Sequence, residues 1–176
     1  MKKLLLLLAF LLPLGLRAQS EPELHYETVQ NGQYQLQYQV PTGWDQVRQA
    51  NDTTVSLTHL SPGRDLMLYL GKLRGAADRL TPNQALHQLA EQFGVTVNKQ
   101  FTTTYNGIQF LETTGTGNRD GQVLRYDALV ARHRGHVLLI CVSGTPDAFL
   151  THEPEVQHML HSLAPYAPKG RRATSR

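Results

Sequence analysis

The chain has 176 residues, 40% of them hydrophobic, which is enough for one domain with a hydrophobic core. Its formal net charge of +3 disappears once residues 1–18 are set aside, because they hold three of the 17 basic residues and none of the 14 acidic ones. Four further bases lie in the last eight residues, so the body of the chain carries 10 bases against 14 acids. This balance excludes the basic surface of a nucleic-acid-binding protein.

Residues 1–18 have the pattern of a secretory signal peptide. Lys2 and Lys3 precede an apolar run over residues 4–12, and Ala18 is a small residue suited to cleavage. The apolar run is shorter than the roughly 20 residues that span a bilayer. We therefore expect cleavage near Ala18 and a periplasmic or extracellular mature chain without a transmembrane segment.

Cys141 is the only cysteine of the chain. A single cysteine excludes an internal disulfide, although the expected destination is oxidising. Cys141 lies within an apolar stretch, so we interpret it as a small core residue and not as a reactive thiol. No cysteine follows the apolar run of the signal peptide, where a bacterial lipoprotein would need one.

The first half of the chain predicts three strands after a polar lead-in at residues 19–32. Residues 33–40 alternate tyrosine, leucine or valine with glutamine, which is typical of a strand with one solvated face. Residues 53–60 and 66–73 predict two more strands, joined by a Ser-Pro-Gly turn. Residues 66–70 are consecutively apolar, which indicates a strand covered on both faces.

A helix is predicted after Thr81. Thr81 and Gln84 form a capping box, Pro82 suits the first turn, and Gly94 ends the helix. One face of this helix carries the apolar residues Ala85, Leu86, Leu89, Ala90 and Phe93.

Next comes a meander of strands. Residues 95–105 lead into Asn106-Gly107, the strongest short hairpin signal, because both residues tolerate the positive φ of a type I′ turn. Residues 108–117 then form the returning strand, and we expect a loop over residues 117–121.

The meander ends in the most apolar strand of the chain. Residues 123–132 alternate apolar and polar side chains, and Arg134-Gly135 forms a tight corner. Residues 137–142 follow without any polar face, so this strand must be covered on both sides. We therefore expect a central sheet with helices on both faces.

The last helix begins near residues 145–147 and runs to Leu163, with Pro154 inside it. Either a short turn ends before Pro154 and the main helix starts there, or one longer helix kinks. In both cases Val156, Met159, Leu160 and Leu163 form the buried face. Residues 166–176 are predicted to be a disordered basic tail, which leaves 33–165 as a single domain.

This order of elements resembles the PsbP/Mog1-like fold, which includes DcrB- and LpqN-type exported envelope proteins. The resemblance covers most of residues 34–163 and includes the Pro-x-Gly-Trp strand end at residues 41–44, the Asn-Gly hairpin and the final helix. It implies an α+β fold, an α/β/α sandwich whose central, largely antiparallel sheet of six to seven strands is flanked by two main helices. It also implies a family whose members act as extrinsic subunits, envelope accessories or protein-binding modules and not as enzymes. The resemblance assigns no functional residue to this chain.

A possible metal site lies on the last helix. His158 and His161 are three residues apart and share a face, so they could ligate zinc, nickel or copper, with His152 or Glu155 assisting. Two exposed histidines on a helix are also common, and no third convergent ligand is visible.

The case for an enzyme is thinner. No nucleophile elbow, His-Glu-x-x-His motif or phosphate-binding glycine loop is present. Asp120 is explained by turn chemistry, Asp127 by a wetter sheet face, and Ser143 by the start of the last helix. Residues 115–121 are either a mobile binding loop or an ordinary hairpin end.

These features predict an exported, non-catalytic binding or accessory module of the cell envelope that requires no cofactor and has an unidentified protein partner. The alternative is a periplasmic protein that binds a small ligand in a pocket between sheet and helix, or a metal at His158 and His161.

Overall fold

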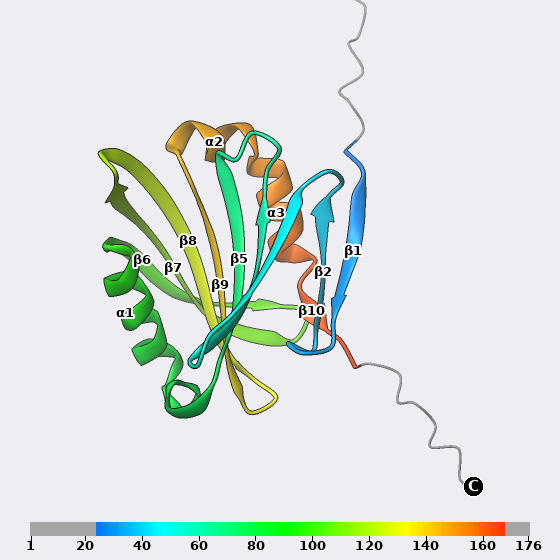
Figure 1. The fold of residues 1–176 in the computed structure, drawn as a ribbon, viewed down its shortest axis with the longest axis vertical. Coiled ribbons are helices and arrows are strands. Elements are labelled where there is room, and N and C mark those ends of the chain that lie inside the picture. The colour runs from blue at the N-terminus through cyan, green and yellow to red at the C-terminus, as the bar shows by residue number, and fades with distance from the viewer. Residues whose placement is uncertain (1–23, 168–176) are drawn as a thin grey trace, which may run out of the picture.

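The structure is a computed structural model that describes residues 24–167 (Figure 1). Its larger sheet has seven strands in the order β3-β4-β5-β9-β8-β7-β6, and all neighbours are antiparallel. The strands are β3 (Asp45–Ala50), β4 (Thr54–Leu60), β5 (Leu66–Leu73), β6 (Val95–Tyr105), β7 (Ile108–Arg119), β8 (Gln122–His133) and β9 (His136–Gly144). This confirms the predicted α+β sandwich around a largely antiparallel sheet of six to seven strands.

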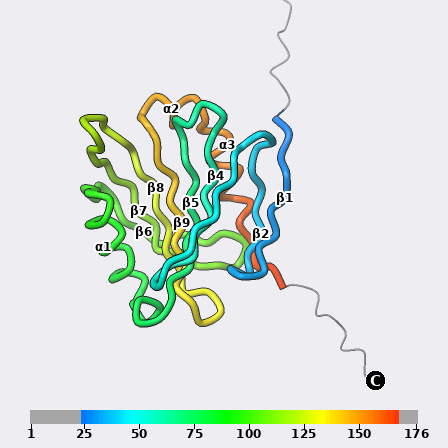
Figure 2. Tube along the Cα trace, in the orientation of Figure 1, coloured from blue at the N-terminus to red at the C-terminus, as the bar shows by residue number. Residues whose placement is uncertain are grey.

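A smaller sheet and the helices complete the fold. The smaller sheet has the order β1-β2-β10, with β1 (Tyr26–Asn31), β2 (Leu36–Pro41) and β10 (Ala164–Pro165). The helices are α1 (Pro82–Phe93), α2 (Pro146–Thr151) and α3 (Glu153–His161), and a 3-10 turn, η1 (Gly75–Arg79), precedes α1. Figures 1 and 2 show α1 and the smaller sheet at opposite ends of the molecule.

The central strand β9 separates two hydrophobic cores. Its buried residues alternate between them: Leu138, Ile140 and Val142 pack with β2, α2 and α3, whereas Leu139 and Cys141 pack with α1. The prediction that this strand is covered on both faces is therefore confirmed. Each face of the strand buries apolar area, which is the main favourable term in folding.

The signals that define α1 are all present. The Thr81 hydroxyl accepts a hydrogen bond from the Gln84 amide, and the Gln84 side chain accepts one from the Thr81 amide. Gly94 ends the helix in the left-handed conformation, with φ of 61°. Both ends of the helix thus have the predicted caps.

Two helices meet at His152, just before Pro154, which decides between the two predicted forms of the last helix. α2 is a short helix capped by the Thr145 hydroxyl, and α3 is a second helix with Pro154 in its first turn. Proline is tolerated there because the amide it lacks would have no partner within the helix. The predicted buried residues Val156, Met159, Leu160 and Leu163 are all 2% exposed or less.

The prediction of a loop over residues 117–121 is wrong. β7 continues to Arg119, and the chain turns through only Asp120 and Gly121, which have φ of 54° and 81°. This is a two-residue type I′ hairpin like that at Asn106-Gly107. The interpretation of residues 115–121 as a mobile binding loop is therefore wrong too, because most of them belong to a paired strand.

Three strands that the sequence did not predict, β1, β3 and the two-residue β10, lie at sheet edges. β3 is exposed at every position, and β1 has no buried residue. Edge strands need no apolar alternation, so their sequences lack the pattern by which buried strands are found. Val29 is nevertheless packed against the main core, which fixes β1 to the domain.

β5 departs from its prediction on one face. Leu66, Leu68 and Leu70 are buried as expected, but Met67 and Tyr69 on the other face are only half-buried. The reason is the position of α1, which packs against β6, β7, β8 and β9. The part of the sheet formed by β3, β4 and β5 therefore has an open face.

Three predictions fall outside the described residues. The signal peptide at residues 1–18, its cleavage near Ala18, and residues 168–176 of the basic tail cannot be compared with the fold. Among residues 24–167, no helix is long and apolar enough to cross a membrane.

Candidate ligand-binding groove

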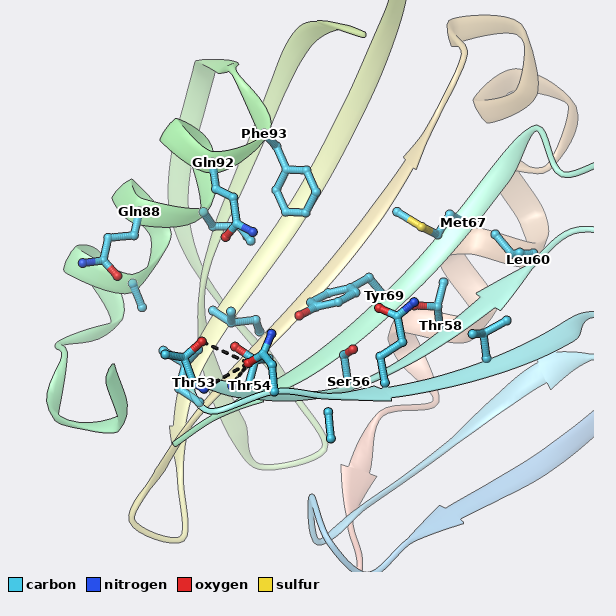
Figure 3. A pocket seen from close by; sticks show the side chains of 18 of the residues that line it. Thr53, Thr54, Ser56, Thr58, Leu60, Met67, Tyr69, Gln88, Gln92 and Phe93 are labelled. Atoms are coloured by element: carbon cyan, nitrogen blue, oxygen red, sulfur yellow. Dashed lines mark hydrogen bonds between the residues drawn. The ribbon is translucent and has the colours of Figure 1, made fainter. Parts of the chain in front are cut away.

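The open face of β3, β4 and β5 forms the floor of a groove whose wall is α1 (Figure 3). The groove has a volume of about 910 Å³. This lies in the range of small-molecule and cofactor sites. Its residues come from segments that are distant in the chain, so only the folded sheet brings them together.

Tyr69 lies on the floor of this groove. A Cβ atom at Gly71 would lie 2.8 Å from the Tyr69 hydroxyl oxygen and 2.9 Å from its Cε1 atom. The Tyr69 ring therefore occupies the space directly over Gly71, which only glycine leaves free. Burial raises the pKa of the Tyr69 phenol, and a hydrogen bond with Ser56 acts in the opposite direction.

The wall of the groove carries two glutamines. Gln88 and Gln92 are one turn apart on α1, so both side chains point from the same face of the helix. Both side chains are exposed, and neither side chain makes a hydrogen bond within residues 24–167. Figure 3 shows Gln88, Gln92 and the neighbouring Phe93 on the helix that borders the groove. Two amide side chains thus remain available to a ligand.

The opposite rim is formed by β3 and the short β3–β4 turn. The Asn51 side-chain oxygen accepts hydrogen bonds from the amides of Thr53 and Thr54, at 3.0 and 2.7 Å. These bonds, drawn as dashed lines in Figure 3, hold the turn in one conformation. The rim therefore has a defined shape without a bound ligand.

The groove is almost free of charge. Among its lining residues the only ionisable groups are the Arg119 guanidinium and the Tyr69 phenol, and no carboxylate is present. The remaining polar groups are amides and hydroxyls, including Gln49, Thr54 and Thr58. Such a surface suits a neutral polar ligand or one with a negative group near Arg119.

Behind the groove, β4 is fixed by a buried hydrogen bond. The Tyr38 hydroxyl lies 2.8 Å from Nε2 of His59, and both residues are 2% exposed or less. Burial lowers the pKa of His59 from 6.5 to about 4, with a further contribution from Arg48. The imidazole is therefore neutral at pH 7, and its pairing with Tyr38 satisfies both buried groups.

The two histidines predicted to bind metal are each engaged with a different aromatic ring. His158 stacks on Tyr26 with ring centroids 3.8 Å apart, and its Nε2 lies 2.5 Å from the Gln39 side-chain oxygen. His161 instead packs edge-on against Tyr105, with centroids 5.3 Å apart. Within residues 24–167 no group of three or more His, Cys, Asp or Glu side chains could hold a metal ion. The metal site stays a prediction.

His152 lies apart from this pair. Its Nδ1 is 3.1 Å from a carboxylate oxygen of Glu155, and its Nε2 is 3.7 Å from one of Asp65. Its ring also packs edge-on against Trp44, with centroids 6.4 Å apart. The two residues expected to assist a metal site thus interact with each other and with the loop before β5.

Three other residues that were considered as possible reactive groups, Asp127, Cys141 and Ser143, are buried. Asp127 does not lie on a wet face, because it is 5% exposed and pairs with Arg125 at 3.0 Å. Burial still raises the pKa of Asp127, while Arg125 acts to lower it. Burial raises the pKa of Cys141 to about 12, which agrees with an inert core thiol. Ser143 is 6% exposed, and no histidine hydrogen-bonds to it within the described chain.

The sequence analysis considered a pocket between sheet and helix only as the alternative function, and it identified none of the residues that line the groove. Its polar residues alternate with apolar ones on β4 and occupy the polar side of α1, so each segment looks like an ordinary solvated face. The only local signal is Gly71 inside an apolar strand, since glycine there often marks a close approach to the backbone.

Several solved structures share this fold. Cyanobacterial PsbP (CyanoP) from Synechocystis sp. PCC 6803 is 14% identical with a TM-score of 0.63, and the match covers 88% of this chain and 99% of that one. LpqN of Mycobacterium tuberculosis, which is involved in cell envelope biogenesis, is 13% identical with a TM-score of 0.51, over 83% and 93%. PA94 from Pseudomonas aeruginosa, a protein of unknown function, is 18% identical with a TM-score of 0.50, over 84% and 99%.

No family model and no curated protein matches the chain. At 13–18% identity these likenesses establish the fold alone. The chain therefore has the PsbP/Mog1-like fold that the order of its elements predicts.

Proposed function

We propose that this protein is an exported, non-catalytic accessory module of the cell envelope, and that it acts by binding through the groove between α1 and the β3–β5 part of the sheet. The observation that carries the proposal is the groove lining. Gln88 and Gln92 are exposed there without internal partners, next to an aromatic floor and a fixed rim. Polar side chains arranged in this way around a concave surface are typical of binding sites.

The proposal of a non-catalytic role rests on what the groove contains. Its lining has no carboxylate, histidine or cysteine that could act as a general base or nucleophile. CyanoP, LpqN and PA94 are not described as enzymes, and LpqN is involved in cell envelope biogenesis. The likeness to LpqN supports an envelope role for this chain as well.

Export is proposed from the signal-peptide pattern of residues 1–18. Cell fractionation and mass spectrometry of the purified protein check this point. We expect the protein outside the cytoplasm, with a mature N-terminus near Gln19. An intact Met1 on protein recovered from the cytoplasm would contradict it.

The binding role is tested by affinity capture. The tagged mature chain is crosslinked in its native cell envelope, captured, and compared with the variant Q88A/Q92A. Gln157 provides the matched control, because it is an exposed glutamine on α3, a helix that packs against the other core of the protein. We expect the wild type and Q157A to capture the same component, and Q88A/Q92A to lose it.

The captured component also distinguishes the two forms of the proposal. A protein recovered in a groove-dependent manner identifies an accessory subunit of a larger assembly. A small molecule recovered in the same manner identifies a ligand-binding protein. Equal recovery by the wild type and Q88A/Q92A would contradict a role for the groove.

A further inference from the structure

We infer that the groove binds an extended oligosaccharide, with Tyr69 as the ring on which a sugar stacks. The inference rests on the proposed function, because it names the chemical class of the ligand for the same groove.

The first argument is the position of Tyr69. Because its ring lies over Gly71, one side of the ring covers the sheet and the half-buried side chain faces the groove. A pyranose ring has a face of C–H groups, which are weakly positive and match the negative face of an aromatic ring. Figure 3 shows Tyr69 between the strand that carries Ser56 and the helix that carries Gln92. A sugar on Tyr69 would thus have polar side chains on both sides.

The second argument is the type of polar group that surrounds the ring. Every sugar hydroxyl is both a donor and an acceptor, and so needs partners of both kinds. Side-chain amides and hydroxyls supply both, whereas carboxylates only accept and ammonium groups only donate. Gln88 and Gln92 stand on one side of the groove, and Thr54 and Thr58 stand on the other. This lining matches the hydroxyl pattern of a neutral sugar.

The third argument concerns the backbone of the floor. Of the three strands under the groove, β4 and β5 are internal, so their amides and carbonyls are already paired in the sheet ladders, whereas β3 is the edge of the sheet. An extended peptide gains much of its affinity from main-chain hydrogen bonds to an open sheet edge. Within the seven-stranded sheet, β4 and β5 offer no such groups and the open edge of β3 lies at the rim, so a ligand over Tyr69 is recognised by side chains. This favours an oligosaccharide over a peptide strand.

The fourth argument is the extent of the groove. It meets a second hollow of about 440 Å³, and the two share Leu60, Met67 and Arg119. Together they follow β5, whose eight residues extend about 25 Å at roughly 3.3 Å per residue. A linear chain of several sugars fits this length. The second hollow adds Arg64 and Asp65, so charged side chains of both signs lie at this end of the groove and the part around Tyr69 remains the one suited to a neutral sugar.

The inference is tested with cellohexaose, maltohexaose, chitohexaose and lysozyme-digested peptidoglycan fragments. Each is titrated into the ¹⁵N-labelled mature chain and followed by NMR. We expect at least one of them to shift the backbone amides around Tyr69 and Gln92, with a dissociation constant below about 1 mM. Tyr69→Ala should weaken binding about tenfold, and Tyr69→Phe should keep it.

Two further variants separate recognition from folding. Q88A/Q92A changes only exposed helix positions, where alanine is a good helix former, and should weaken binding without changing the NMR fold pattern. Q157A should bind like the wild type. The inference is overturned if no probe shifts the groove amides at about 10 mM, or if Tyr69→Ala and Q88A/Q92A both bind like the wild type.

The capture experiment keeps this failure distinct from failure of the proposed function. If Q88A/Q92A loses a captured protein while no saccharide binds the wild type, the groove is a protein-binding site. The saccharide inference is then wrong and the accessory role stands. If neither capture nor saccharide binding depends on the groove, the saccharide inference and the proposed binding function of the groove are both wrong.

Discussion

The buried pair of Tyr38 and His59 makes the stability of this protein fall as the pH is lowered through a defined window. The His59 imidazole is neutral in the folded state, with a pKa of about 4, whereas it titrates near 6.5 in the unfolded chain. A lowered histidine pKa means that the unfolded state binds the proton first. The contribution of His59 is thus fully present above pH 6.5 and is lost between pH 6.5 and 4.

The size of the effect follows from the two pKa values. One pKa unit corresponds to about 1.4 kcal/mol, so the shift from 6.5 to about 4 removes about 3 kcal/mol of unfolding free energy by pH 4. About 2 kcal/mol of this is already lost between pH 7 and pH 5. A domain of this size is stable by only 5–15 kcal/mol, so the change is large.

The variant His59→Gln isolates this contribution, because glutamine does not titrate and its amide can still pair with the Tyr38 hydroxyl. Urea unfolding of the mature chain at pH 7, 6 and 5 gives the unfolding free energy of each protein. The buried carboxyls Glu112 and Asp127, whose pKa values are raised by burial, titrate equally in both proteins and cancel. We expect the wild type to lose about 2 kcal/mol more than the variant between pH 7 and 5. Equal losses would refute the burial of a neutral His59.

Three further predictions concern other parts of the chain. The Asp78 carboxylate accepts hydrogen bonds at 2.7 Å from the Val137 amide and at 2.7 Å from the His136 imidazole. Asp78→Ala should therefore lower the unfolding free energy, measured by urea unfolding, by about 2 kcal/mol. An unchanged unfolding midpoint would show that this link between η1 and β9 is not needed. Thr81→Ala removes the cap of α1 and should cost about 1 kcal/mol by the same assay, whereas Thr81→Ser should cost much less; equal losses would exclude the hydroxyl as the cause. If His158 and His161 hold a metal, zinc should raise the melting temperature of the wild type but not of H158A/H161A, and equal melting temperatures with and without zinc would contradict the metal site.

Most of the fold follows from signals that lie close together in the sequence. Asn106-Gly107 has the positive φ angles of a type I′ turn, 47° and 84°, because these two residue types are the least strained there. Likewise, Thr81 and Gln84 define the start of α1 within four residues. Such signals depend on local chemistry alone, so they can be recognised without knowing the fold.

The errors arise where local pattern and tertiary position disagree. Gly115 and Gly117 belong to the predicted strand 108–117 but also suggested a loop over residues 115–121, whereas in the structure they are strand residues that allow close approach. A Cβ at Gly115 would lie 2.5 Å from Val95 Cγ1, and one at Gly117 would lie 3.0 Å from the Gly94 carbonyl oxygen. The strand β3 was missed for the opposite reason, because an exposed edge strand carries no apolar signal.

The residues that line the groove could not be predicted, because the position of the groove depends on how far one helix extends across a sheet. α1 packs against β6 to β9 and leaves Met67 and Tyr69 on β5 half-buried. Residues 66–70 of β5 would be equally apolar if a helix covered both faces of the strand, so their sequence cannot reveal which face is open. The predicted site residues His158 and His161 each contact a different aromatic ring, and these contacts depend on β1 and β6, which lie far away in the sequence.

The most direct test of the account is site-specific photocrosslinking in the native envelope. A benzophenone amino acid replaces Gln92 in the groove wall in one protein and Gln157 on α3 in another. If the groove is the working surface, irradiation links the Gln92 protein to an envelope component and leaves the Gln157 protein unlinked. Identical products from both positions, or a product from Gln157 alone, would contradict the claim that this protein acts through its groove.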